Sequence, residues 1–183
     1  MAKQRRLAFV LGGAKCVWAD LEQARSLAFP DVVLAVNTIG VDYADHIDYL
    51  VSYHSDLLAV WARRRKERNL PAPTWLWTGK ALSKHAPRSV KQHDSRGGSS
   101  GLLATQIALD DAAATHVILV GVPMDPTMRH YHDNKKGNPW KDGTHYHGHW
   151  RQRLSVLNGR VKSMSGWTKD LLGEPTKRWL EGD

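Results

Sequence analysis

The chain has 183 residues, of which 42% are hydrophobic and 24% are charged, with one cysteine and a formal net charge of +8. This length suits one domain with a substantial core, and the composition excludes an intrinsically disordered protein. No apolar run approaches the roughly 18 residues of a membrane span, and the lone Cys16 cannot form an internal disulfide. We expect one domain over residues 1–183, in a reducing, bacterial-type cytoplasm.

Much of the positive charge lies in two clusters, at 63–68 and at 135–141. An excess of cations favours anionic partners, namely nucleotides, nucleic acid or acidic lipids. For the first cluster a solvated helix end is the simpler interpretation, because cations complement the dipole at a helix C-terminus.

Short apolar runs alternate with helical patterns along most of the chain. Strands are expected at 6–11, 32–36, 48–52, 74–77, 116–120 and 160–165, with loops and one edge strand within 78–95. Helices are expected at 17–28, after a cap at Ser55 or Asp56, from Gly101 to Ala113, around Leu171 and from Pro175. Continuous apolar strands alternating with helices predict a doubly wound, mostly parallel α/β sheet of the Rossmann type. The polar segment 124–149 is expected to form a lid loop over this sheet.

Ligands of open α/β sheets bind beyond the carboxyl ends of the strands. Glycines there allow a close backbone approach, and a following helix offers free N–H groups to an anion. A plain tight turn and an ordinary serine cap are the alternatives. The candidate residues at these strand ends are Gly12, Gly13, Asn37, His54, Ser99, Ser100 and Gly101.

Histidines are concentrated late in the chain, at His130, His132, His145, His147 and His149. They can belong to a solvated loop, to a zinc site built on His-x-His pairs, or to a catalytic base. Cys16, close to a helix start, can be a reactive thiolate or a buried structural thiol.

The segment His145-Tyr146-His147-Gly148-His149 resembles the His-Tyr-x-Gly-His motif of the bacterial sialyltransferases of glycosyltransferase family 42 and their relatives. Shorter matches occur in the same order as in that family, over about residues 6–166. They are Leu11-Gly12-Gly13, Asn37, Ser99-Ser100-Gly101, Gly121-Val122-Pro123 and Tyr131.

This resemblance implies metal-independent, inverting transfer of a sugar from a CMP-linked donor, with no further cofactor. By this resemblance Tyr131, Tyr146 and the helix start at Ser100-Gly101 would stabilise the departing phosphate. His149 would be the general base for the acceptor hydroxyl. Asn37 and Ser99 would contact the nucleotide.

The sequence departs from the family pattern at three positions. Gly13 and His54 stand where the family has asparagines, and Asp125 stands where it often has a second lid tyrosine. These departures weaken the case for CMP-sialic acid itself and leave another nucleotide-linked donor, or a hydrolase, open.

Two other functions remain as alternatives. One is an inactive nucleotide- or nucleic-acid-binding protein that uses its basic surface, with Trp140 and Trp150 stacking on bases. The other is a metal-dependent hydrolase that uses the histidine-rich segment, with zinc as the metal. Residues 161–180 also resemble small proteins of tailed phages, which suggests a phage or prophage origin and a bacterial host cytoplasm. The oligomeric state is left open.

Overall fold

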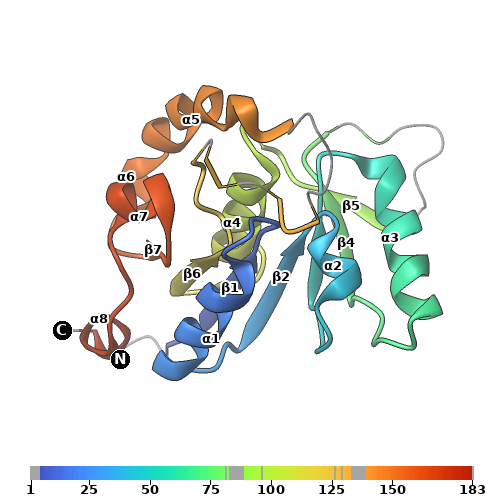
Figure 1. Cartoon of the computed structure of the whole chain (residues 1–183), viewed down its shortest axis with the longest axis horizontal. Helices are drawn as coiled ribbons and strands as arrows, with labels where there is room; N and C mark the ends of the chain where they lie inside the picture. The colour runs from blue at the N-terminus through green and yellow to red at the C-terminus, as the bar shows by residue number, and fades with distance from the viewer. Residues whose placement is uncertain are drawn as a thin grey trace.

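The computed structural model describes residues 5–80, 82, 89–95, 97–125, 127–128, 130–132 and 139–182. Within them, seven strands form one sheet in the order β5-β4-β3-β2-β1-β6-β7 (Figure 1). Every neighbouring pair in this sheet is parallel. The strands are β1 (Leu7–Leu11), β2 (Val32–Val36), β3 (Tyr49–Val51), β4 (Trp75–Thr78), β5 (Val90–Gln92), β6 (His116–Val120) and β7 (Val161–Ser163).

Helices cover both faces of the sheet, as in a Rossmann-like doubly wound fold (Figure 1). α1 (Val17–Leu27), α2 (Ile39–Asp42) and α3 (Ser55–Glu67) bury apolar side chains in the cluster on one face. α4 (Ser100–Asp110) and α6 (Leu154–Leu157) do so on the other face. The remaining helical elements are the 3-10 helix η1 (Pro139–Tyr146), α5 (His147–Gln152), α7 (Gly166–Leu172) and α8 (Lys177–Glu181).

The predicted α/β fold with a parallel sheet is confirmed, and the expected strands lie within two residues of the observed ones. All five residues of β1 and of β2 are buried, because helices cover both faces of these central strands. The edge strand expected within 78–95 is β5. α4 ends at Asp110, three residues before the expected end at Ala113.

The expected lid loop at 124–149 is only partly a loop. From Pro139 onward the chain is helical, first as η1 and then as α5. Trp150 is fully buried in the core beside α4, and the His147 ring stacks on Trp167 with centroids 3.5 Å apart. These two aromatic anchors tie the segment to the sheet, which its polar composition did not indicate. Lys135 and Lys136 lie outside the described residues.

One arginine of the 63–68 cluster is an interior residue and not part of a solvated helix end. Arg65 is fully buried, and its guanidinium donates to the backbone carbonyls of Gly40, Tyr43, Asp45 and Pro71. Arg65 therefore ties α3 to α2 and to the residues that follow each of these helices. Its neighbours Arg63 and Arg64 are exposed as expected.

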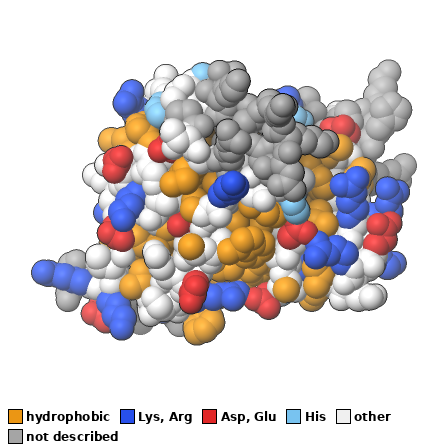
Figure 2. Space-filling model, viewed as in Figure 1, with side chains coloured by type: hydrophobic (Ala, Val, Ile, Leu, Met, Phe, Trp, Pro, Cys, Tyr) orange, Lys and Arg blue, Asp and Glu red, His pale blue; other side chains and the backbone are white. Residues whose placement is uncertain are grey.

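Among the described residues, no helix is both long enough and apolar enough to cross a membrane. On the face shown in Figure 2, the described Lys and Arg side chains are scattered among Asp and Glu and do not form one basic patch.

Candidate functional site

A cavity of about 460 Å³ lies at the carboxyl ends of β1, β2, β3 and β6. This is where the sheet order reverses, because β1 has β2 on one side and β6 on the other. Ligands of doubly wound folds bind at such a position, and the volume is in the range of small-molecule sites. Its lining residues are Gly12, Gly13, Val36, Asn37, Thr38, His54, Leu57, Trp61, Ser99, Ser100, Gly101, Gly121, Val122, Met124, His130, Gly143, His145 and Tyr146.

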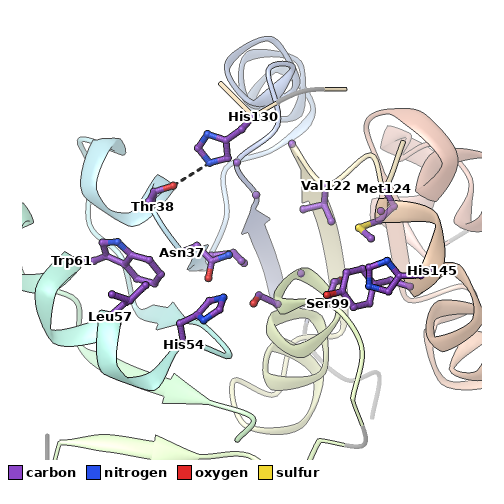
Figure 3. A pocket seen from close by; sticks show the side chains of 18 residues that line it. Asn37, Thr38, His54, Leu57, Trp61, Ser99, Val122, Met124, His130 and His145 are labelled. Atoms are coloured by element: carbon purple, nitrogen blue, oxygen red, sulfur yellow. Dashed lines mark hydrogen bonds between the residues drawn. The ribbon is translucent and has the colours of Figure 1, made fainter. Parts of the chain in front are cut away.

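Two walls of this cavity face each other in Figure 3. His54, Leu57 and Trp61, on and just before α3, form one side of the view. Met124 and His145 lie on the opposite side, and Asn37 and Ser99 lie between the two walls. Each wall thus combines apolar surface with one histidine, and the first also carries the large aromatic ring of Trp61.

The ends of β1 and β6 touch at Gly12. The Gly12 N–H donates to the Val120 carbonyl at 2.7 Å. A β-carbon at position 12 would lie 2.3 Å from the Gly121 carbonyl oxygen. No side chain fits there, so the cavity floor is made of backbone.

The segment 130–132 docks on the next glycine. The Tyr131 N–H donates to the Gly13 carbonyl at 3.0 Å, and Ala14 forms an antiparallel bridge with His130. His130 Nε2 also lies 3.1 Å from Thr38 Oγ1 (Figure 3). These contacts make His130 part of the cavity wall.

Asn37, the residue after β2, is fixed in an unusual backbone conformation with φ of 58°, which asparagine tolerates better than most residues. Ser52 Oγ donates to Asn37 Oδ1 at 2.6 Å, and Ser52 Oγ in turn accepts from the His54 N–H at 2.9 Å. Because its oxygen is engaged in this way, the Asn37 amide presents its NH₂ group as a donor at the cavity wall.

The N-terminus of α4 opens onto the same cavity. Ser99 caps the helix, its Oγ accepting from the Leu102 N–H at 3.3 Å. Ser100 Oγ accepts from the Tyr53 N–H at 3.3 Å. The backbone N–H groups of Ser100 and Gly101 belong to the first helical turn and have no intrahelical acceptor. Together with the helix dipole they favour an anion.

The described wall of the cavity contains no Lys, Arg, Asp or Glu side chain. Its titratable side chains are three histidines, His54, His130 and His145, and Tyr146. An anion would therefore be held by backbone N–H groups, hydroxyls and an amide, with charge available only from protonated imidazole.

Eight of the eleven predicted site residues line this cavity. They are Gly12, Gly13, Asn37, His54, Ser99, Ser100, Gly101 and Tyr146. Tyr131, His149 and Asp125 do not.

Tyr131 is engaged in a hydrogen-bond cluster outside the cavity. Its hydroxyl donates to Asp42, and the same carboxylate also contacts His132 and Arg68. Burial raises the pKa of Tyr131, and the hydrogen bond to Asp42 raises it further. Burial alone would raise the pKa of Asp42, but its hydrogen bonds from Tyr131, His132 and Arg68 lower it below the ordinary value. The predicted catalytic hydroxyl is thus a donor that stays protonated.

His149 and Asp125 lie elsewhere. His149, on α5, lines a second cavity with Gly97, whereas His145 of the same motif lines the first. Asp125 accepts from the Thr127 N–H at 2.8 Å and from its hydroxyl at 2.7 Å. These two hydrogen bonds lower the pKa of Asp125.

Thr38 and Trp61 were not expected at the site, and His130 and His145 were expected only as two of five histidines that could bind zinc or act as a base. All four line the cavity. His145 begins the motif that was recognised, and Thr38 directly follows Asn37. Trp61 has a helical spacing that indicates a core residue, and it is also largely buried. The position of His130 depends on how its segment folds back on Gly13, and no pattern in the sequence indicates this.

Cys16 does not have the surroundings of a reactive thiol. Burial raises its pKa to about 12, against the lowering effect of a hydrogen bond with Ser165. Within the part of the chain that the structure describes, no group of three or more His, Cys, Asp or Glu side chains could hold a metal ion. Compared with protein-family models, with curated proteins and with solved structures, the chain matches none of them.

Proposed function

We propose that the first cavity binds a nucleotide through its phosphate, and that the protein transfers a group from a nucleotide-linked sugar. The observation that carries the proposal is the N-terminus of α4, where Ser99, Ser100 and Gly101 open onto a cavity at the reversal point of a parallel sheet. Helix N-termini at such positions bind phosphate groups in many nucleotide-binding folds.

Different parts of the ligand would contact different parts of the cavity. The Leu57 and Trp61 wall offers apolar and aromatic surface on which a nucleobase can pack. The phosphate would lie at the α4 N-terminus, within reach of the Asn37 amide. The sugar would then extend toward His145 on the opposite wall. Tyr146, the next residue in the chain, also lines the cavity.

The chemistry of transfer fits these residues without a metal. Departure of a nucleoside phosphate builds negative charge on its oxygens, and preorganised donors at that point lower the barrier. Backbone N–H groups of α4 and the Tyr146 hydroxyl are such donors. The resemblance assigned the general base to His149, but His145 is the motif histidine that lines the cavity. We therefore propose His145 for proton transfer.

Neither alternative function gains support from a particular observation. Trp150, which was expected to stack on nucleic-acid bases, is fully buried, and the Trp140 side chain lies outside the described residues. For the metal-dependent hydrolase, the described His147 is engaged by Trp167 and by the Met124 carbonyl, with its Nε2 2.8 Å from that oxygen.

The test is thermal stabilisation of the full chain by a panel of nucleotides and CMP-linked sugars, with and without EDTA. A ligand that binds only the folded state at 100 times its Kd stabilises it by about 2.7 kcal/mol. A selective shift that EDTA does not change supports the proposal, and turnover of the best donor is then assayed in wild type and in His145→Ala. No shift with any member of the panel would overturn it.

A further inference from the structure

A second cavity, of about 260 Å³, lies beside the turn that precedes α4. Gly97, His149, Gln152 and Arg153 line it. Ser99 and Ser100 line the first cavity. The two cavities therefore lie along the same four-residue stretch of backbone.

The three side chains of this cavity come from one face of one helical segment. His149, Gln152 and Arg153 have i, i+3 and i+4 spacing, which places them on the same side of α5 and its C-cap. The orientation of α5 is set by Trp150, which is fully buried. The imidazole of His149 faces the glycine turn, since a β-carbon on Gly97 would lie 3.5 Å from His149 Cε1.

The turn itself keeps the cavity open. Gly97 and Gly98 have φ values of 88° and 110°, a region that side-chain-bearing residues rarely adopt. A β-carbon on Gly98 would lie 2.8 Å from Leu102 Cδ2. Two consecutive glycines thus let the backbone pass close to α5 without a side chain filling the space.

Arg153 is the only cation that lines this cavity within the described part of the chain. It is half-buried, yet among the described residues no carboxylate lies within ion-pair distance and no hydrogen bond engages its guanidinium. Arg25 and Arg68, by comparison, each pair with an aspartate. A guanidinium that lines a cavity without an anionic partner favours binding of an oxyanion, because its planar set of N–H donors matches the geometry of a carboxylate or phosphate.

We propose that this second cavity binds the carboxylate or phosphate group of a second ligand. Arg153 provides the charge and the paired donors, and His149 and Gln152 add hydrogen bonds from the same helix face. Where the first cavity holds a nucleotide-linked donor, the second receives an acidic acceptor. That assignment to an acceptor rests on the proposed function, whereas oxyanion binding at Arg153 does not.

The test is an NMR titration of the ¹⁵N-labelled full chain with sodium phosphate and, separately, sodium acetate, with ionic strength held constant by sodium chloride. Saturable shifts are expected at the Gly97 amide and at the Arg153 Nε–H. The probe that saturates at the lower concentration distinguishes a phosphate from a carboxylate site. Arg153→Gln should weaken binding by about tenfold or more.

The matched control is Arg151→Gln, which removes the same charge from the same helix. Arg151 is exposed and lies over the Trp167 ring at 5.5 Å, so binding should change by less than about twofold. Arg153→Lys keeps the positive charge but lacks the paired guanidinium donors, so it should bind the anion with intermediate affinity. This variant preserves the test if Arg153→Gln folds poorly. Shifts that do not saturate in wild type, or that persist unchanged in both Arg153 variants, would overturn the proposal.

The two sites are separable in the same spectra. Ser99→Asp places a negative charge in the first cavity and should abolish phosphate-dependent shifts of the Gly101 amide. The Gly97 titration should weaken through the nearby negative charge but remain saturable, because Ser99 does not line the second cavity. If the Gly101 amide of the wild type shows no phosphate-dependent shift while the Gly97 amide does, the result counts against the proposed function and not against the Arg153 site.

Discussion

The imidazole of His130 occupies the space beside Gly13 that any side chain at position 13 would need. A β-carbon there would lie 2.6 Å from His130 Nε2. The contact joins the turn after β1 to a segment more than a hundred residues later, from which His130 lines the candidate site.

Gly13→Ala should therefore displace His130 and weaken the docking of 130–132. Overpacking of this kind costs about 1–3 kcal/mol, which urea unfolding would measure. Gly148→Ala is the control, because nothing lies within 4 Å of a β-carbon there. Its position inside α5 predicts a gain of up to about 1 kcal/mol. Equal stability of the two variants would show that His130 is not held against Gly13.

Ser99 has two separable roles, as a helix cap and as part of an anion site. Ser99→Ala should lose about 1 kcal/mol of stability, the usual value of an N-cap. Ser99→Asp should retain the stability, because aspartate also caps helices and complements the helix dipole. The aspartate variant should nevertheless lose nucleotide-induced stabilisation, since its carboxylate repels phosphate. Retained nucleotide binding in Ser99→Asp would show that the phosphate does not bind at the N-terminus of α4.

Tyr131→Phe should lower the stability of the protein by an amount that depends on pH. The hydrogen bond from Tyr131 helps to lower the pKa of Asp42 in the folded state. Its stabilisation is therefore fully present above the unfolded pKa of Asp, about 3.9, and is lost as pH falls through the lower folded value. The difference between wild type and Tyr131→Phe should be about 1 kcal/mol near pH 6 and should shrink below about pH 4.

Tyr146→Phe is the control for this variant, because no hydrogen bond to another described residue engages the Tyr146 hydroxyl. Its stability should stay within about 0.5 kcal/mol of wild type, while nucleotide binding or turnover falls. If Tyr146→Phe melts early while Tyr131→Phe keeps the stability of the wild type, then the Tyr146 hydroxyl, and not that of Tyr131, has the structural role.

Arg65→Met should be among the most destabilising single changes. It would leave the carbonyls of Gly40, Tyr43, Asp45 and Pro71 without this donor. The hydrogen bonds to Gly40 and Tyr43 are buried, and an unsatisfied buried group costs about 1–3 kcal/mol. Arg64→Met, one residue earlier and exposed, should change stability by less than about 0.5 kcal/mol. Chemical denaturation of the pair provides the measurement, and similar midpoints would refute the interior role of Arg65.

Cys16 should react slowly with thiol reagents. Its pKa of about 12 leaves little thiolate at pH 8. The rate of reaction with a chromogenic disulfide should be well below that of free cysteine and should rise on unfolding in urea. A rate equal to that of free cysteine in the native protein would contradict the buried surroundings of the thiol.

The strands could be predicted from sequence because their cause is local. The runs Leu7–Leu11 and His116–Val120 are almost continuously apolar, which a strand covered on both faces requires. Their central position in the sheet follows from the same property. The glycines and serines after the strands also marked the correct edge of the sheet, since parallel strands bring all their carboxyl ends together.

The helical structure of residues 139–149 could not be predicted in this way. Its structure depends on two aromatic side chains that pack against partners far away in the sequence, Trp150 in the core beside α4 and His147 on Trp167. The rest of the segment 124–149 is mostly polar, so its composition indicated a loop.

The sequence by itself thus determined the parallel α/β sheet and the strand ends at which a ligand can bind, because both follow from local hydrophobic patterns and glycine turns. Tertiary structure alone decided which of the late histidines and tyrosines line the cavity. Tyr131 faces Asp42, His149 faces Gly97, and His130 and His145 line the cavity. The direction of each side chain depends on how helices and loops pack over the sheet, and that packing is set by contacts between residues distant in the chain.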